Sequence, residues 1–170
     1  MHKFIHRMVL RSAVNAALQR ANVYGKDADN LLKKDFKEGA RSWLEQFGYR
    51  YHRKSASCQN WCSDINQLAQ LLTKKLNGKR VSFGVAQKMV SLYLKYLWLL
   101  GNEDKKPLFA VLDRGIIKKA KVPNPPNWTS LDLKEYKRVA ACVDDFAQEK
   151  HGCDGAEWES KVWVDNDNKK

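Results

Sequence analysis

The chain has only four cysteines and four histidines in 170 residues, and neither set has the spacing of a familiar metal site. Cys58 and Cys62 could bind a metal together with His52, but Cys142 and Cys153 lie too far apart to complete a known zinc motif. A disulfide framework is not expected in an intracellular chain of this length. The glycine-rich phosphate loop, the dinucleotide fingerprint and the HExxH and GxSxG motifs are also missing. We therefore predict no metal and no cofactor.

Long apolar runs are absent as well. No segment approaches the roughly 20 apolar residues that cross a membrane. Near the start of the chain, the apolar run Met8–Leu10 is too short for the core of a signal peptide. Residues 1–26 contain no acid, which faintly resembles a mitochondrial transit peptide, but a basic first helix explains the same pattern more simply. We predict no membrane partner and a cytoplasmic location.

Acidic residues are scarce in the first two thirds of the chain. Residues 1–121 contain 24 lysines and arginines against 9 acids, a net charge of +15, whereas residues 122–170 have a net charge of −3. So large and uneven a charge favours a polyanionic partner, with nucleic acid first and an acidic membrane surface second. The alternative is that the charge only keeps the protein soluble.

Apolar residues recur at helical spacing along most of the chain, and no segment alternates as a strand would. A chain of 170 residues is expected to form one domain with a substantial core. We predict an all-α fold with a single compact helical domain, residues 1–164, followed by a flexible tail, residues 165–170. The expected helices cover residues 3–21, 29–36, 40–47, 59–76, 85–100, 114–121, a segment that begins at Thr129 or Ser130, and 154–164.

The segment from Asn77 to Lys121 organises this domain. It contains a basic connection, a nearly apolar helix, a return loop and a second helix that opens on Leu112-Asp113-Arg114. A helix that is apolar over most of its circumference should lie buried at the centre, with its polar face toward water, a partner or a site. The polar side chains on that narrow face are Gln87, Lys88, Ser91 and Lys95.

Lys88 and Asp113 are the candidate catalytic pair within this segment. The apolar helix is roughly 24 Å long. The connection formed by residues 101–112 can span more than roughly 30 Å when extended, so Asp113 can return to the end of the helix that carries Lys88. A lysine amine that faces a carboxylate beside a cationic connection suits amine nucleophile chemistry. The alternative is a surface lysine and an aspartate that caps a helix.

Two basic segments suit contact with a nucleic acid. Lys79 and Arg80, together with the backbone N–H groups at the start of the next helix, can bind a phosphate. In residues 48–57, tyrosines alternate with cations, an arrangement that suits stacking on bases and contact with phosphates. The alternative for this second segment is an ordinary exposed loop. Its cations are Arg50, His52, Arg53 and Lys54.

In these residues the chain resembles the helix-hairpin-helix DNA glycosylase superfamily, and within it the compact archaeal-type 8-oxoguanine DNA glycosylase/lyases. The stretch Gly84-Val-Ala-Gln-Lys88 is similar to the family hairpin G-h-G-x-K, which ends on the catalytic lysine. The stretch FAVLDRGII, residues 109–117, is similar to the one that carries the catalytic aspartate. Residues 129–136 and 156–163 are similar to the helices that follow. The likeness covers about residues 60–164, with an alanine in place of the second hairpin glycine and a longer loop before the aspartate.

The resemblance implies a helix-hairpin-helix glycosylase-like fold. The four cysteines do not match the closely spaced set that holds an iron–sulfur cluster in endonuclease III-like relatives, so we predict no cluster. A target nucleotide of double-stranded DNA would flip into a pocket between the helical layers. Lys88 would attack the sugar C1′, displace the base and form a Schiff base, while Asp113 would stabilise positive charge and assist proton movement. The expected DNA contacts are Lys79, Arg80, Gly84, Gln87, Arg114 and Lys118. The candidate base-pocket aromatics, each of which could instead be a core residue, are Trp61, Trp158 and Trp163.

We accordingly expect a monomeric, nucleoid-associated DNA glycosylase, with AP-lyase activity, that removes 8-oxoguanine or another damaged or modified base. Two other interpretations stay open. In the first, the chain is a non-catalytic helix-hairpin-helix DNA-binding module in which Lys88 and Asp113 form a structural pair. In the second, it is a helical interaction protein with no role on DNA.

Overall fold

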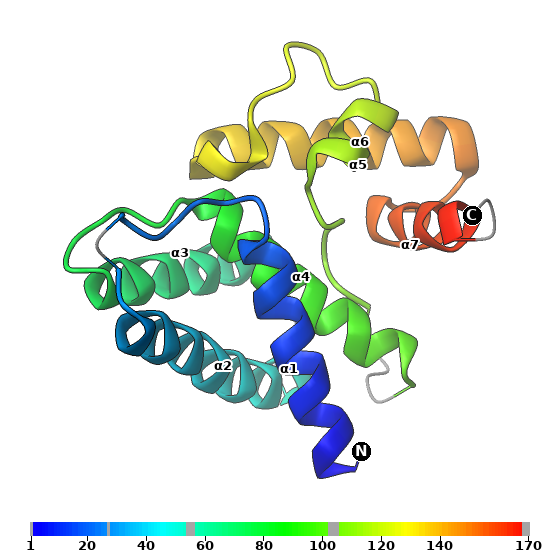
Figure 1. Ribbon diagram of the computed structural model, residues 1–170. Helices are drawn as coiled ribbons and strands as arrows, with labels where there is room; N and C mark the ends of the chain where they lie inside the picture. Colours follow the sequence, from blue (N-terminus) through cyan, green and yellow to red (C-terminus); the bar gives the residue numbers. More distant parts are fainter. Residues whose placement is uncertain (1, 27, 54–56, 102–105, 168–170) are drawn as a thin grey trace.

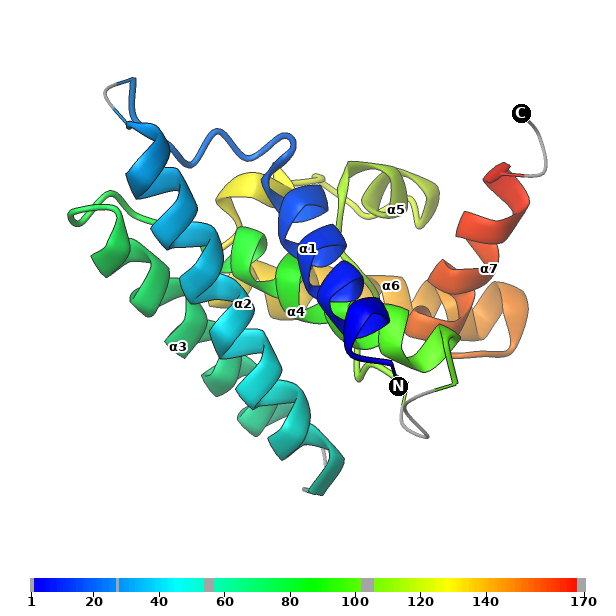
Figure 2. The same cartoon turned by 60° about the horizontal axis from the view of Figure 1, so that its bottom comes forward.

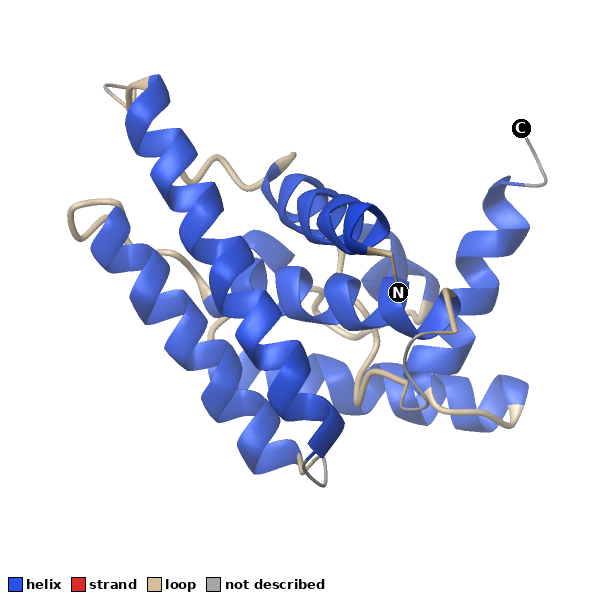
Figure 3. Ribbon diagram, turned by 90° about the horizontal axis from the view of Figure 1, so that it is seen from below, coloured by secondary structure: helices blue, strands red, loops and turns tan. Residues whose placement is uncertain are grey.

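The structure is a computed structural model that describes residues 2–26, 28–53, 57–101 and 106–167 (Figure 1). Helices are the regular elements of these ranges, and no strand occurs in them (Figure 3), which confirms the all-α prediction. None of the described helices is long and apolar enough to cross a membrane. The elements are α1 (Lys3–Leu18), α2 (Asn30–Arg53), α3 (Cys58–Lys75), α4 (Phe83–Leu99), α5 (Arg114–Lys119), the 3-10 helix η1 (Trp128–Ser130), α6 (Leu133–His151) and α7 (Gly155–Asp167).

Helix α4 is the centre of the fold, as its apolar composition predicts. Helices α2 and α3 lie side by side on one flank of α4, α6 and α7 lie on the other, and α1 crosses α4 (Figures 1 and 2). Every residue from Phe83 to Lys95 is buried. One core cluster of buried side chains runs through the helices, from Val9 in α1 to Trp158 in α7. The position of a side chain on α4 therefore decides which neighbouring element it meets.

The first turn of α4 is fixed by contacts with a segment far along the chain. Ser82 caps the helix, because its Oγ accepts a hydrogen bond from the Val85 N–H at 3.1 Å. The same hydroxyl donates to the carbonyl oxygen of Thr129 at 2.6 Å. The Gly84 N–H donates to the carbonyl oxygen of Leu131 at 3.1 Å. These bonds hold η1 against the start of α4, one turn from Lys88.

The return segment before α5 has no regular secondary structure in its described residues and packs against α4. Its residues Ala110, Val111 and Leu112 are buried. Gln87 holds this segment through both atoms of its amide: Nε2 donates to the Leu112 carbonyl at 2.8 Å, and Oε1 accepts from the Leu112 N–H at 3.4 Å. Asp113 is thereby placed beside Lys88, so the predicted return of the aspartate to the lysine is confirmed.

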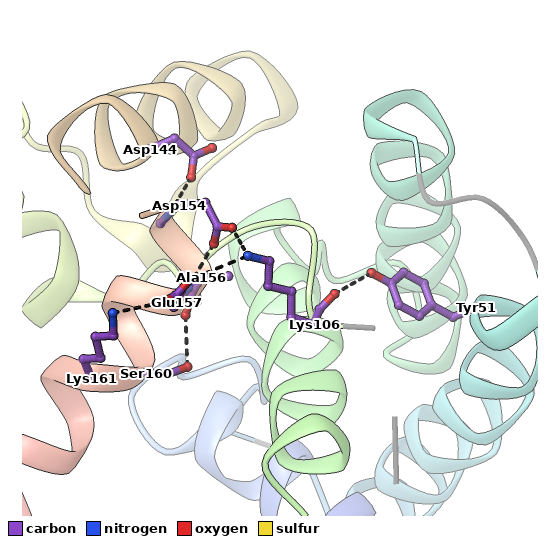
Figure 4. A network of polar contacts seen from close by, with 9 residues as sticks. Tyr51, Lys106, Asp144, Asp154, Ala156, Glu157, Ser160 and Lys161 are labelled. Atoms are coloured by element: carbon purple, nitrogen blue, oxygen red, sulfur yellow. Dashed lines mark hydrogen bonds and ion pairs between the residues drawn. The ribbon is translucent and has the colours of Figure 1, made fainter. Parts of the chain in front are cut away.

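Lys106, near the beginning of the return segment, is also held in place by a hydrogen bond and an ion pair (Figure 4). Tyr51 of α2 donates its hydroxyl hydrogen to the Lys106 carbonyl at 3.1 Å. The Lys106 ammonium pairs with Asp154, which caps α7 by accepting the Glu157 N–H at 3.0 Å. The return segment thus connects α2 with α7 on its way to the site.

The structure corrects the prediction of two short helices at 29–36 and 40–47 and of a basic loop at 48–57. Helix α2 is continuous from Asn30 to Arg53, and Arg50 therefore lies on a helix. The reason is a buried stripe at helical spacing that continues past residue 47. Residues 54–56, including Lys54, lie outside the described residues. The stripe consists of Phe36, Ala40, Leu44, Phe47 and Tyr51.

Two boundaries in the last third also differ from the prediction. Thr129 and Ser130 belong to η1, and α6 begins at Leu133 because the Asp132 side chain accepts the Glu135 N–H at 2.8 Å. Helix α7 continues to Asp167, so the predicted tail at 165–170 is helical over its first part. Its last residues, 168–170, lie outside the described residues.

Candidate active site

Lys88 and Asp113 meet in the structure. The Lys88 Nζ lies 3.3 Å from Asp113 Oδ2, and the two side chains are 11% and 19% exposed. The other carboxylate oxygen, Oδ1, accepts the N–H groups of Gly115 at 2.9 Å and Ile116 at 3.1 Å, which caps α5. Asp113 therefore has one oxygen fixed by the backbone and the other turned toward the lysine amine.

The Lys88 amine also lies on the face of an aromatic ring. Its Nζ is 4.5 Å from the centre of the Trp128 ring, a favourable distance for a cation over an indole. Trp128 is buried and belongs to η1, which the bonds to Ser82 and Gly84 hold in place. Trp128 was not among the residues expected at the site, because it stands among prolines and asparagines without any periodic signal. The amine is enclosed between a carboxylate and an indole.

A cavity of about 150 Å³ opens beside this pair. Its walls come from five elements or their ends, which include the end of α1, a helix that was not expected at the site. Trp163 of α7, one of the candidate base-pocket aromatics, is 44% exposed and lines the cavity. The lining residues are Ala16, Gln19, Arg20, Lys88, Leu92, Tyr96, Asp113, Arg114, Gly115, Trp128 and Trp163.

A wider groove of about 740 Å³ adjoins the cavity. The two share Arg20, Arg114 and Trp128 among their lining residues. Among the residues that the structure describes, four cations and no acid line the groove, so its potential is positive. Arg114 and Lys118 were selected from the sequence, whereas Arg20 and Lys121 were missed. A polyanion in this groove would lie next to Lys88.

A second, deeper ion pair joins α4 to α7. The Lys95 Nζ lies 2.8 Å from Glu159 Oε1, and the two side chains are 5% and 1% exposed. Burial lowers the pKa of Lys95 and raises the pKa of Glu159, while each partner's charge opposes that shift in the other. Glu159 also accepts a backbone hydrogen bond from Val111. The pair holds α7 against α4 and the return segment, with Trp163 in contact with the Lys95 ammonium at 5.1 Å from the ring centre.

Two residues expected to contact DNA are buried inside the protein. Gln87 is fully buried, and its amide is used by the Leu112 backbone. The Gly84 N–H is used by the Leu131 carbonyl, and a Cβ at this position would collide with the carbonyl oxygen of Trp128. The predictions for Gln87 and Gly84 are therefore wrong. Both residues position the site from within.

Two of the three tryptophans expected at the base pocket are core residues. Trp61 is buried and donates its indole N–H to the Tyr136 hydroxyl at 2.8 Å. Trp158 is buried against Phe146 and His151. Neither lines the cavity, so only Trp163 keeps its predicted place.

Lys79 and Arg80 are exposed in the connection that joins α3 to α4. That connection turns at Asn77 and Gly78, both with positive φ, as predicted for the end of α3. Neither cation lines the cavity or the groove. They are accessible to a polyanion but stand apart from the site.

Metal ligands do not cluster in the described ranges, where no group of three or more histidine, cysteine, aspartate or glutamate side chains could hold an ion. Comparisons of the chain with protein-family models, with curated proteins and with solved structures found no match. The chemistry of the site is therefore inferred from its own geometry.

Proposed function

We propose that this chain is a DNA glycosylase with AP-lyase activity and a helix-hairpin-helix glycosylase-like fold, and that it removes a damaged or modified base through a lysine Schiff base. The observation that carries the proposal is the Lys88 amine, 3.3 Å from the Asp113 carboxylate, on the wall of a cavity. A groove lined by four cations adjoins that cavity and suits the phosphate backbone of DNA.

The first chemical step assigns a role to each member of the pair. The target nucleotide leaves the stack and enters the cavity. The free amine of Lys88 attacks the sugar C1′, the C1′–N bond of the base breaks, and the base departs with the bonding electrons and takes up a proton. Asp113 Oδ2, within reach of the amine, accepts the proton that the new C1′–N bond displaces and passes it to the departing base.

The second step yields a covalent enzyme–DNA intermediate. Opening of the sugar ring leaves a Schiff base between Lys88 Nζ and C1′, from which the 3′ phosphate can be eliminated. During base departure in the first step, positive charge develops on the sugar. The Asp113 carboxylate, which two N–H groups fix through Oδ1, stabilises that charge without reorienting. The indoles of Trp128 and Trp163 offer apolar walls to a flipped base.

A second candidate function is a DNA-binding module without catalysis. The observation in its favour is that both members of the pair have structural partners: Asp113 caps α5, and Lys88 lies over Trp128. In that case the pair only joins α4 to α5 and η1. The two functions share the cationic groove and differ in the chemistry of the Lys88 amine.

Borohydride trapping separates the two. Duplexes that carry 8-oxoguanine, an abasic site or hypermodified cytosines are incubated with the native protein, with Lys88→Gln and with Lys75→Gln as the matched control. Lys75 is also a paired lysine, 2.7 Å from Asp35, but it lies on α3 and lines neither the cavity nor the groove. We expect a covalent adduct with the native protein and the Lys75 variant and none with Lys88→Gln. Binding of every duplex without any adduct would refute the lysine nucleophile.

A further inference from the structure

A second group of cations lies on α2, and none of them lines the cavity or the groove. Lys33, Lys34, Lys37 and Arg41, together with Asn30, line an open hollow of about 320 Å³. Lys33, Lys37 and Arg41 are four residues apart in turn and share one face of the helix. Eight residues of α-helix separate the first from the last, a distance of about 12 Å. The hollow is therefore elongated along a row of positive charge.

The charges of this row have no acidic partner in the described part of the chain. Asp35 turns to the other side of α2 and pairs with Lys75 at 2.7 Å. Asp29 accepts the Leu32 N–H at 2.7 Å as a cap. The Arg41 Nε is covered by the protein and has no hydrogen-bond acceptor. Since like charges at this spacing repel one another, the row favours an anion from outside.

Most of the polar groups at the row are hydrogen-bond donors. The Tyr24 ring lies beneath the Lys33 ammonium, 6.0 Å from its centre. Burial raises the pKa of Tyr24, so its hydroxyl keeps its hydrogen, and this hydroxyl has no hydrogen-bond partner among the described residues. Ammonium, guanidinium and hydroxyl groups are the donors that contact phosphate oxygens in nucleic acid complexes.

The hollow lies close to the groove. Arg20, at the end of α1, lines the groove, and Tyr24, four residues later, contacts the α2 row. Four residues span at most about 14 Å, so the two cationic surfaces lie on either side of the short linker between α1 and α2. A single DNA duplex, with a charge roughly every 1.7 Å along its axis, is long enough to reach both.

We propose that the α2 hollow binds backbone phosphates of the DNA, as a second contact apart from the excision site. The row is about 12 Å long, which fits several successive phosphates of one strand better than it fits one small anion. The proposal rests on the proposed function for the identity of the polyanion, and it extends the bound DNA past α1. Under this proposal the α2 cations contribute to the affinity for DNA and take no part in the excision reaction.

The salt dependence of DNA binding tests this site. The affinity for an undamaged 25-base-pair duplex is measured against KCl concentration for the native protein and for Lys33→Gln/Lys34→Gln/Lys37→Gln. A control variant, Lys134→Gln/Lys137→Gln/Lys150→Gln, removes the same charge from α6. Each lost phosphate contact lowers the slope of log affinity against log salt by about 0.9, so the α2 variant should lose about 2 to 3. The control should keep the native slope, and Lys33→Arg/Lys34→Arg/Lys37→Arg should restore it. Equal slopes for the two glutamine variants would overturn the proposal.

The same samples keep this proposal separate from the excision chemistry. A reduced salt slope in the α2 variant supports the second contact even if no duplex gives an adduct. The absence of an adduct refutes only the lysine nucleophile. An adduct together with an unchanged slope refutes the α2 contact and leaves the glycosylase. If the α2 variant loses binding to phosphatidylserine vesicles while its DNA slope stays native, the hollow is a membrane contact and the proposal is overturned.

Discussion

Removing the charge of Glu159 should destabilise the protein strongly, because it leaves the Lys95 ammonium buried without a partner. The two side chains are 5% and 1% exposed, so water cannot replace the lost carboxylate. Loss of one partner of such a pair costs about 3–5 kcal/mol, which is a large share of a typical stability of about 5–15 kcal/mol. For a chain of this size that corresponds to a fall in Tm of roughly 6–20 °C.

Urea unfolding of Glu159→Gln measures this cost, with Asp35→Asn as the matched control. Asp35 is paired with Lys75 at a similar distance but is 57% exposed, and its loss should cost less than about 1 kcal/mol. Lys95→Met/Glu159→Met removes both charges and should recover most of the stability. The reasoning fails if Glu159→Gln is no more destabilising than Asp35→Asn, or if the double variant is as unstable as Glu159→Gln.

Three further variants probe other parts of the site and its support. Gly84→Ala should lose about 1–3 kcal/mol in urea unfolding, because its methyl group meets the Trp128 carbonyl; a stability equal to the native one would contradict the close approach. Above pH 10 the unfolded chain loses the Tyr136 proton, while burial raises the pKa of Tyr136 in the folded protein, so stability should fall with rising pH there; Tyr136→Phe should show a shallower decline. Trp128→Leu should reduce the yield of borohydride adduct without changing the salt slope of DNA binding, and an equal loss of both would show that Trp128 only supports the fold.

The central helix and the meeting of Lys88 with Asp113 could be predicted because each depends on a simple physical rule. A run that is apolar on nearly all sides must be buried, which placed α4. The length of the return connection allowed Asp113 to reach Lys88, and chain geometry set that limit. The first prediction follows from the pattern of apolar residues, and the second follows from the length of the connection. They do not require knowledge of which surfaces pack together.

Trp128 and Arg20 could not be predicted, because long-range packing alone brings them to the site. The segment with Trp128 is joined to the start of α4 by the Ser82 hydroxyl and the Gly84 N–H, two bonds between residues more than 40 positions apart. A contact between such distant residues leaves no periodic pattern in the sequence. Arg20 reaches the cavity because α1 crosses α4, and the charge pattern of α1 is the same wherever the helix packs.

The polar face of α4 shows why Gln87 was misjudged and why Lys88 differs from its neighbours. A polar stripe on an apolar helix indicates only that something polar lies opposite. Here Gln87 meets the Leu112 backbone, Lys95 meets Glu159, and Lys88 meets Asp113, so the stripe aligns the return segment, α5 and α7 with α4. Gln87 and Lys95 are closed off by these partners. Lys88 is the stripe residue that also lines the cavity, so within the stripe its amine is the group placed to meet a ligand.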